Sequence, residues 1–288
     1  MRQLNNLTYY ICGLLFCCCF PLLGQEQQKS DTHTASSSFM LSLGKSHLLD
    51  TYLTQSNYEG LHLSLLHEFM NFTDKHTQKW AYQCLSGVEF STTQTIFQQG
   101  RYWQGAIDFN ATTYRLFSPA RNLHIGVGPS LGMEAGFIYN LRGGNNPATA
   151  KLSVHAGAGA MISYQCLKWK KLPLYFRYQA IVPAVSAFFS PHFGQSYYEI
   201  FTLGNRKGTC IIGSFHNRFD LDQLFTVDMS LGRGYLRLGY SGKMHLTNVH
   251  HIKTRIISHS FLIGYTREFI PFYRRNAADP ERRSNPIF

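Results

Sequence analysis

The chain is dominated by segments in which apolar and polar residues alternate one by one. A clear case is 105–115, where Ile107, Phe109 and Ala111 alternate with Asp108 and other polar residues. Such alternation places two kinds of side chain on the two faces of a β-strand. Similar runs occupy 82–92, 123–140, 150–165, 172–182, 224–231, 236–240 and 257–269. The pattern predicts an all-β protein.

The length of these runs narrows the fold further. Strands of soluble proteins average about five or six residues, whereas about 9–11 tilted residues cross an outer membrane. Many of the runs reach the longer value, and turn clusters such as 140–147 (NLRGGNNP) separate them. Single-chain bacterial barrels have even strand numbers. We therefore expect a transmembrane antiparallel β-barrel of about ten to twelve strands.

The polar faces of the runs carry full charges, which a closed barrel would place in its lumen. A soluble two-sheet protein is the alternative, and it would leave that face in water. In a lumen, acids and arginines can pair across the barrel. The predicted lumen charge network comprises Glu89, Asp108, Glu134, Arg177, Asp228, Arg237 and Glu268. Small residues on the same face, such as Gly126 and Gly159, leave room for large neighbours, so we expect a lumen filled by side chains.

Composition agrees with a membrane barrel. Aromatic residues make up 15% of the chain, and charged residues only 15%, against about 25% in average proteins. Aromatic residues also gather at run ends, for example Tyr102-Trp103 and Phe188-Phe189, as girdles at the two membrane interfaces would. The net charge of +11 suggests attraction to phosphates of outer-membrane lipid and lipopolysaccharide. Nucleic acid is not an expected partner of an exported protein.

The first residues predict export. Arg2 is followed by an apolar run at 9–20 and by Gly24 before a polar stretch, which is the pattern of a secretory signal peptide. We expect a signal peptide at 1–24, a disordered polar segment at 25–38, a barrel at 39–273 and a basic tail at 274–288. The expected location is the cell outer membrane, with the barrel-assembly machinery as a partner.

No motif in the chain predicts a cofactor or a metal. The glycines at 126–132 (GVGPSLG) do not have the dinucleotide-binding spacing and precede no helix. Among thirteen histidines, the densest group includes His245, His250 and His251. Its spacing suggests a loop at 244–253 and no ligand set. We predict no catalytic, cofactor-binding or metal-ligating residue.

Two side-chain groups leave an enzymatic alternative open. His155 lies on a polar strand face next to Ser153, which is the inward-facing arrangement that a lipid or peptide hydrolase would use. Glu68 could form an acid pair with Glu89 or Glu134, although ion pairs to Arg177 and Arg237 are favoured. The sequence favours a non-enzymatic role over both.

The most distinctive segment is 49–60 (LDTYLTQSNYEG). It resembles the L-D-T-Y-L-S-P-x-x-Y-x-G signature of a family of Bacteroidetes outer-membrane proteins, a domain of unknown function with a β-barrel fold. Gln55 stands where that family has proline. The matching residues are Leu49, Asp50, Thr51, Tyr52, Leu53, Tyr58 and Gly60. The resemblance implies a fold and a location but no activity. Locally, a turn at 54–57 should precede a strand that starts at Gly60, and the segment could cap the barrel at its periplasmic end.

Together these features predict an outer-membrane barrel with a polar, side-chain-filled lumen and a structural or accessory role. The alternatives are an outer-membrane hydrolase and a narrow pore. A protein partner in the cell envelope fits the accessory role.

Overall fold

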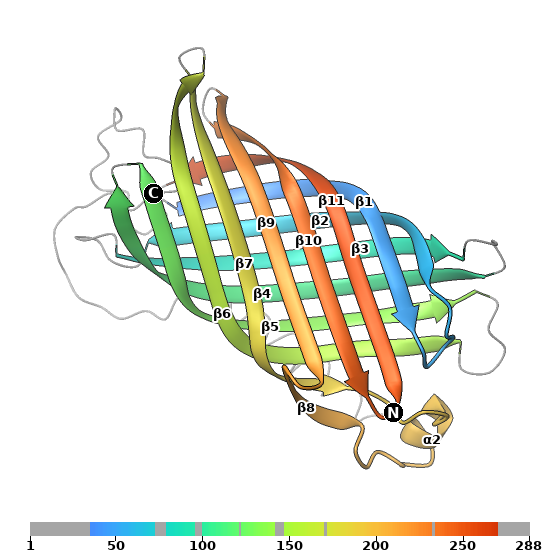
Figure 1. Cartoon of the computed structure of the whole chain (residues 1–288). Coiled ribbons are helices and arrows are strands. Elements are labelled where there is room, and N and C mark those ends of the chain that lie inside the picture. Colours follow the sequence, from blue (N-terminus) through green and yellow to red (C-terminus); the bar gives the residue numbers. More distant parts are fainter. Residues whose placement is uncertain are drawn as a thin grey trace, which may run out of the picture. The chain divides into compact units, whose positions relative to one another are not determined.

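The computed structural model describes residues 35–72, 79–95, 100–120, 122–141, 147–169, 172–231 and 234–269, all within the compact unit Thr32–Phe288. These residues form long β-strands and one short helix (Figure 1). The elements are β1 (Ala35–Asp50), β2 (Tyr58–Phe72), β3 (Trp80–Gln94), β4 (Arg101–Ala120), β5 (Leu123–Asn140), β6 (Ala148–Trp169), β7 (Leu172–Phe189), α2 (Tyr197–Phe201), β8 (Cys210–Ser214), β9 (Arg218–Leu231), β10 (Gly234–Val249) and β11 (Ile252–Phe269). In this part of the chain, no helix is long and apolar enough to cross a membrane.

Ten strands pair in one closed antiparallel ring. Strands β1 to β7 pair in sequence order, β7 pairs with β9, and β9, β10 and β11 follow until β11 pairs with β1. The short strand β8 pairs only with the last residues of β7. Closure removes the unpaired edges that an open sheet would expose. The predicted all-β antiparallel barrel of ten to twelve strands is confirmed, with ten strands in the ring.

Apolar side chains cover the outside of the barrel, and polar and charged side chains point into its lumen. Ile107, Leu131 and Phe261 point outward and are 62%, 64% and 82% exposed, whereas Arg177 and Arg237 point inward and are 1% exposed. A soluble protein has the opposite arrangement. An apolar exterior around a polar interior is the arrangement of a transmembrane barrel, because lipid solvates the outer wall.

The alternating direction of side chains along each strand also corrects the prediction of aromatic girdles. Adjacent residues of a strand face opposite sides, so only one member of each aromatic pair can face outward. Trp103 is 42% exposed, but Tyr102 is 2% exposed and lies inside the barrel, as does Phe188 at 5%. The expectation that both members of such pairs form girdles is therefore wrong.

Two element boundaries differ from the sequence prediction. Strand β1 begins at Ala35, so residues 35–38 are paired with β2 and β11 and are not disordered. Ser36 and Ser38 point into the polar lumen. The stretch therefore lacks the apolar–polar alternation by which the other strands were recognised. The predicted signal peptide at 1–24, the segment 25–34 and the basic tail at 274–288 lie outside the described residues.

The second boundary concerns the loop expected at 244–253. Strand β10 continues to Val249 and β11 begins at Ile252, so only His250 and His251 form the turn. Both residues have positive φ angles, of 53° and 63°. Two-residue hairpin turns need such angles and usually place Asn-Gly there, so the sequence carries no ordinary turn signal at this point.

The segment 190–209, which we call the cap, connects β7 to β8 and includes α2. The Tyr52 hydroxyl donates a hydrogen bond of 2.7 Å to the Gln195 carbonyl, and the Ala150 N–H donates one of 2.6 Å to the Tyr197 hydroxyl. Following the ring from β7 through β9, β10 and β11 to β1 takes four steps out of ten. The bond from Tyr52, beyond the end of β1, therefore joins nearly opposite sides of the barrel mouth.

Candidate functional site

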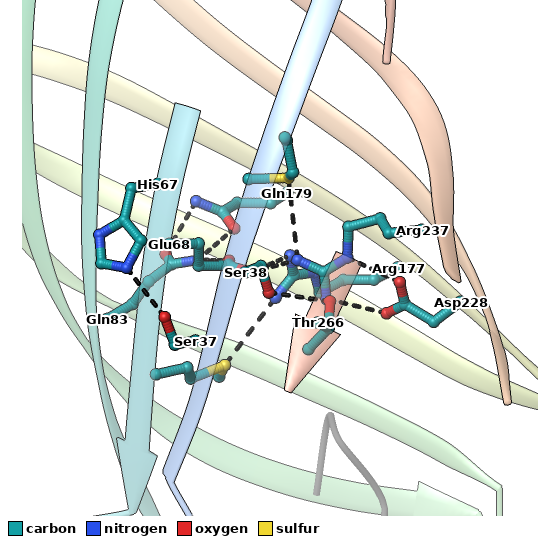
Figure 2. Close-up of polar contacts among 12 residues, drawn as sticks. Ser37, Ser38, His67, Glu68, Gln83, Arg177, Gln179, Asp228, Arg237 and Thr266 are labelled. Carbon is teal, nitrogen blue, oxygen red and sulfur yellow. Dashed lines mark hydrogen bonds and ion pairs between the residues drawn. The ribbon is translucent and has the colours of Figure 1, made fainter. Parts of the chain in front are cut away.

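A layer of charged and amide side chains crosses the lumen, and we call it the sealing layer. At its centre, Glu68 of β2 accepts hydrogen bonds from Arg177 of β7, at 2.7 Å, and from Arg237 of β10 (Figure 2). Arg237 also binds both carboxylate oxygens of Asp228, at 2.6 and 2.9 Å. The sealing layer comprises Glu68, Gln83, Arg177, Gln179, Asp228 and Arg237.

The amide residues extend this layer across the barrel. Gln83 of β3 donates a hydrogen bond to Glu68 and another, of 2.8 Å, to Gln179 of β7. The Tyr114 hydroxyl in turn donates a bond of 3.1 Å to Gln83. The layer therefore links strands from opposite sides of the ring, and hydrogen bonds join all six of its side chains into one network.

Apolar clusters lie on both sides of the sealing layer. Toward the end where β1 starts, the cluster is Met70, Ala81, Tyr114, Leu116 and Met161. Toward the cap, it is Met40, Leu66, Leu85, Leu224 and Leu262. The chain order explains this, since Glu68 lies between inward-facing Met70 and Leu66. Gly159 makes room for Tyr114, because a Cβ there would lie 3.1 Å from the Tyr114 hydroxyl oxygen.

The apolar neighbours make the charges of the sealing layer interdependent. Glu68 and Arg177 are each 1% exposed, and Asp228 is 0% exposed. A buried charge that loses its partner keeps the cost of desolvation without compensation. Each charged group is thus held in place by its partners. Because these side chains are buried, they offer no accessible surface to a substrate, and their arrangement is structural.

A second charged layer lies nearer to the cap, and we call it the cap-side layer. Lys243 of β10 bridges Glu89, at 3.0 Å, and Asp108. His245, two residues further along β10, lies 3.3 Å from Asp220 and 3.6 Å from Asp222. The cap-side layer comprises Glu89, Asp108, Glu134, Arg218, Asp220, Asp222, Lys243 and His245.

The cap-side layer adjoins a small cavity of about 40 Å³. Glu134, Ser153, Arg218 and His245 contribute to its lining. This volume is enough for a few water molecules. A lipid or peptide group would need the surrounding side chains to move apart.

The predicted serine–histidine arrangement does not form in the described residues. Ser153 accepts a hydrogen bond of 3.2 Å from Arg218, and His155 binds the Asn110 side chain at 2.9 Å. No hydrogen bond joins Ser153 to His155 in this part of the barrel. Gly132 leaves room for the His155–Asn110 pair, since a Cβ at position 132 would lie 2.3 Å from His155 Nε2. His155 is therefore a packed lumen residue.

The structure divides the seven predicted network charges among several groups. Asp228 pairs directly with Arg237, and Arg177 pairs with Glu68. Glu89, Asp108 and Glu134 belong to the cap-side layer. Glu268 is half-buried near the end of β11, at the opposite end of the barrel from the cap.

Several charged residues of the cap-side layer were missing from the sequence prediction. Lys243 and His245 lie on the same face as Arg237, so continuing the period of two along β10 would have found them. Arg218, Asp220 and Asp222 precede the run recognised at 224–231. No group of three or more His, Cys, Asp or Glu residues in the described ranges is placed to hold a metal ion.

A family model described as "Protein of unknown function (DUF3316)" matches residues 11–276. The chain belongs to this family. The predicted membership in a family of unknown function is thus confirmed, while the Bacteroidetes origin and the signature remain predictions. No curated protein matches the chain.

Solved structures with a similar fold are outer-membrane proteins. The outer membrane protease OmpT from Escherichia coli is 6% identical, with 85% of this chain and 99% of that chain covered and a TM-score of 0.48. The beta domain of the Bordetella autotransporter BrkA is 10% identical, with 83% and 100% covered and a TM-score of 0.41. An outer membrane channel from Pseudomonas putida is 9% identical, with 87% and 100% covered and a TM-score of 0.36. At these values the likenesses carry no argument about activity.

Within this family member, the segment 49–60 forms the end of β1, a turn and the start of β2. Strand β2 begins at Tyr58, two residues before the predicted start at Gly60. Asp50 Oδ1 accepts a hydrogen bond of 3.0 Å from the Tyr52 N–H, which shapes the turn. Tyr52 then reaches Gln195, so this hairpin is the platform on which the cap docks.

Proposed function

We propose that this protein is an outer-membrane β-barrel with a structural or accessory role, whose lumen is closed by its own side chains. The observation that carries the proposal is the sealing layer, in which Glu68 joins Arg177 and Arg237 between two apolar clusters. A transport path would have to separate these ion pairs. A barrel with such a lumen serves as an anchor that presents its loops.

The cap is the element that such an anchor presents. Outer-membrane barrels have short periplasmic turns and longer extracellular loops. The cap, 190–209, lies at the end of the barrel opposite the start of β1 and the end of β11, where the hairpins β1–β2, β3–β4 and β5–β6 also turn. Loop length therefore favours an extracellular position for this end and for the 49–60 hairpin, in place of the periplasmic end suggested by the sequence. A partner in the cell envelope and the barrel-assembly machinery remain part of the proposal.

Membrane embedding is tested by a charge on the lipid-facing wall. Leu131 points outward from the middle of β5 and is 64% exposed. Leu131→Arg should lower the stability of the inserted barrel by about 2–4 kcal/mol, the usual cost of arginine near the bilayer midplane. The measurement is the amount of heat-modifiable protein in the membrane fraction. Asn205→Arg, in the exposed cap, is the control and should assemble normally; equal assembly of both variants would contradict the proposal.

A hydrolase ranks second and rests on one observation. His245 lies between two carboxylates beside the small cavity, and an acid–histidine pair can activate water. If this cluster is catalytic, purified protein should cleave lipid or peptide, and His245→Ala should abolish cleavage while the barrel stays folded. A narrow pore is disfavoured by the sealing layer.

A further inference from the structure

We propose that the outer wall at the cap end carries a binding site for the phosphate of an anionic lipid headgroup, formed by Lys253 and Arg255 of β11. This inference rests on the proposed membrane location. The ligand would bind to the outside of the barrel and would not enter the lumen.

Strand register places these residues in one outward-facing band. Arg255 lies directly opposite Leu49 of β1 on one side and Leu246 of β10 on the other, and Leu246 lies opposite Phe219 of β9. Directly opposite residues in antiparallel strands share a face, with Cβ atoms about 4.5–5.5 Å apart. An exposed guanidinium thus stands in a row of apolar side chains near the cap end of β11, which the proposed membrane location puts where lipid headgroups meet acyl chains.

A second cation stands above the first on the same strand. Lys253 precedes Arg255 by two residues and shares its outward face, so their Cα atoms are about 6.6 Å apart. Lys253 is exposed and lies opposite Asn248 of β10. Two cations at this spacing can contact different oxygens of one phosphate, and arginine is suited to bidentate phosphate binding.

A cavity of about 270 Å³ opens at these residues. Leu49, Phe219 and Leu246 line it together with Lys253 and Arg255. The volume lies just below the range of about 300–1,000 Å³ typical of pockets for whole drug-sized ligands. It fits a headgroup whose acyl chains run down the apolar wall.

The backbone around this cavity is fixed by hydrogen bonds. The Thr51 N–H donates to the Lys253 carbonyl at 3.0 Å, and the Lys253 N–H donates to the Thr51 hydroxyl at 2.8 Å. The Asn248 N–H donates to the Asn217 carbonyl at 2.9 Å, which holds the turn 215–217 over the site. A site formed in advance loses less conformational freedom when it binds.

The two cations differ from the lumen cations in their ion pairing. Inside the barrel, Arg177, Arg237 and Lys243 each have a carboxylate partner. Among the described residues, neither Lys253 nor Arg255 makes an ion pair. Outward-facing cations at a membrane surface are attracted to anionic headgroups. The counter-charge that the protein does not supply is available from lipid.

The test is native mass spectrometry of the full-length mature protein in detergent micelles, with lipid A, the phosphorylated anchor of lipopolysaccharide, as the probe. We expect the wild type to retain one lipid A, and the double variant Lys253→Gln with Arg255→Gln to retain at least tenfold less. Arg101→Gln is the matched control, because Arg101 is an exposed cation at the same barrel end, on β4. It should retain lipid like the wild type.

Two further arms identify the ligand. Leu246→Asn should weaken lipid retention, because the apolar part of the site is lost, and inorganic phosphate at equal concentration should not displace the lipid. Retention that is unchanged in the double variant, or equally reduced in Arg101→Gln, would overturn the proposal, and so would displacement by inorganic phosphate. Heat-modifiable mobility of each variant is measured in parallel, so failure of this site is distinguishable from failure of the barrel to insert.

Discussion

The two charged layers of the lumen contain the same kinds of residue in different surroundings. In the sealing layer, the side chains of Glu68, Arg177 and Arg237 are 1–2% exposed and lie between apolar clusters. In the cap-side layer, the side chains of Lys243 and His245 are 12% and 16% exposed, and His245 lines a cavity. The first layer has no route for water to replace a lost partner. The second has one, so the same substitution should have different consequences in the two layers.

The largest expected effect is the loss of Arg237. This residue is the partner of Asp228 and one of two cations at Glu68. Arg237→Ala should lower the free energy of unfolding by about 3–5 kcal/mol, because it strands a buried carboxylate. Urea unfolding in lipid vesicles measures this. Adding Asp228→Asn should recover part of the loss, and Arg177→Ala should cost less, since Glu68 keeps Arg237. A loss below about 1 kcal/mol would place the layer in contact with water.

The matching substitution in the cap-side layer is Lys243→Ala. Glu89 and Asp108 lose their shared cation, but their side chains are 6% and 10% exposed, so water reaches them more readily than it reaches Glu68 or Asp228. We expect a smaller loss in the same urea experiment, of about 1–3 kcal/mol. A loss as large as that of Arg237→Ala would remove the distinction between the layers.

The cap should respond to the loss of a single hydroxyl. Tyr52→Phe removes the hydrogen bond to Gln195, which contributes about 0.5–1.5 kcal/mol. Trypsin should then cleave at the exposed Arg206 and Lys207 about 2- to 10-fold faster, while unfolding of the barrel is unchanged. Cleavage at the wild-type rate would show that the cap docks through other contacts.

Alkaline titration examines the same contact from its protonation state. Burial, together with Tyr197, Asp50 and Glu199, raises the pKa of Tyr52 to about 12. The docked cap therefore favours the neutral phenol, and this contribution to docking is complete below pH 10 and is lost as the pH rises from about 10 to 12. The difference in absorbance at 295 nm between the wild type and Tyr52→Phe should titrate as one tyrosine with a midpoint near pH 12. A difference that titrates with a midpoint near pH 10 would contradict the docked geometry.

The smallest effect is expected at the turn between β10 and β11. His251 is exposed and has a φ of 63°, a conformation that costs a residue with a Cβ about 1–2 kcal/mol. His251→Gly should therefore raise the unfolding free energy by about 1 kcal/mol. His251→Ala is the control and should bring no gain. Equal effects of the two variants would show that the change in unfolding free energy comes from loss of the histidine side chain and not from the backbone conformation.

The strands that the sequence identified are those whose inward positions are polar or small. In β4 and β5, Asp108 and Gly132 alternate with outward apolar residues, and the period of two is plain. Strands β1 and β2 were largely missed because Met40 and Leu66 point inward and build an apolar cluster inside the lumen. An inward apolar residue breaks the alternation on which the prediction depends.

The favoured ion pairs of Glu68 to Arg177 and Arg237 are confirmed, but the pairing of the other lumen charges was less accessible from sequence than their inward direction. Alternation shows that Asp108 points inward, but its partner Lys243 lies on β10, across the barrel from β4. Which residues meet there depends on strand number and on the stagger of strands around the ring. Neither follows from the pattern within a single strand.

The central claim is that the sealing layer closes the lumen, and conductance across a planar lipid bilayer tests it most directly. Wild-type protein is inserted, and insertion is verified by heat-modifiable mobility of the same preparation. We predict no discrete conductance steps, because ions cannot pass Glu68, Arg177 and Arg237 without separating them from one another. Stable, reproducible conductance steps from the inserted wild-type protein would contradict the account and would favour the narrow pore.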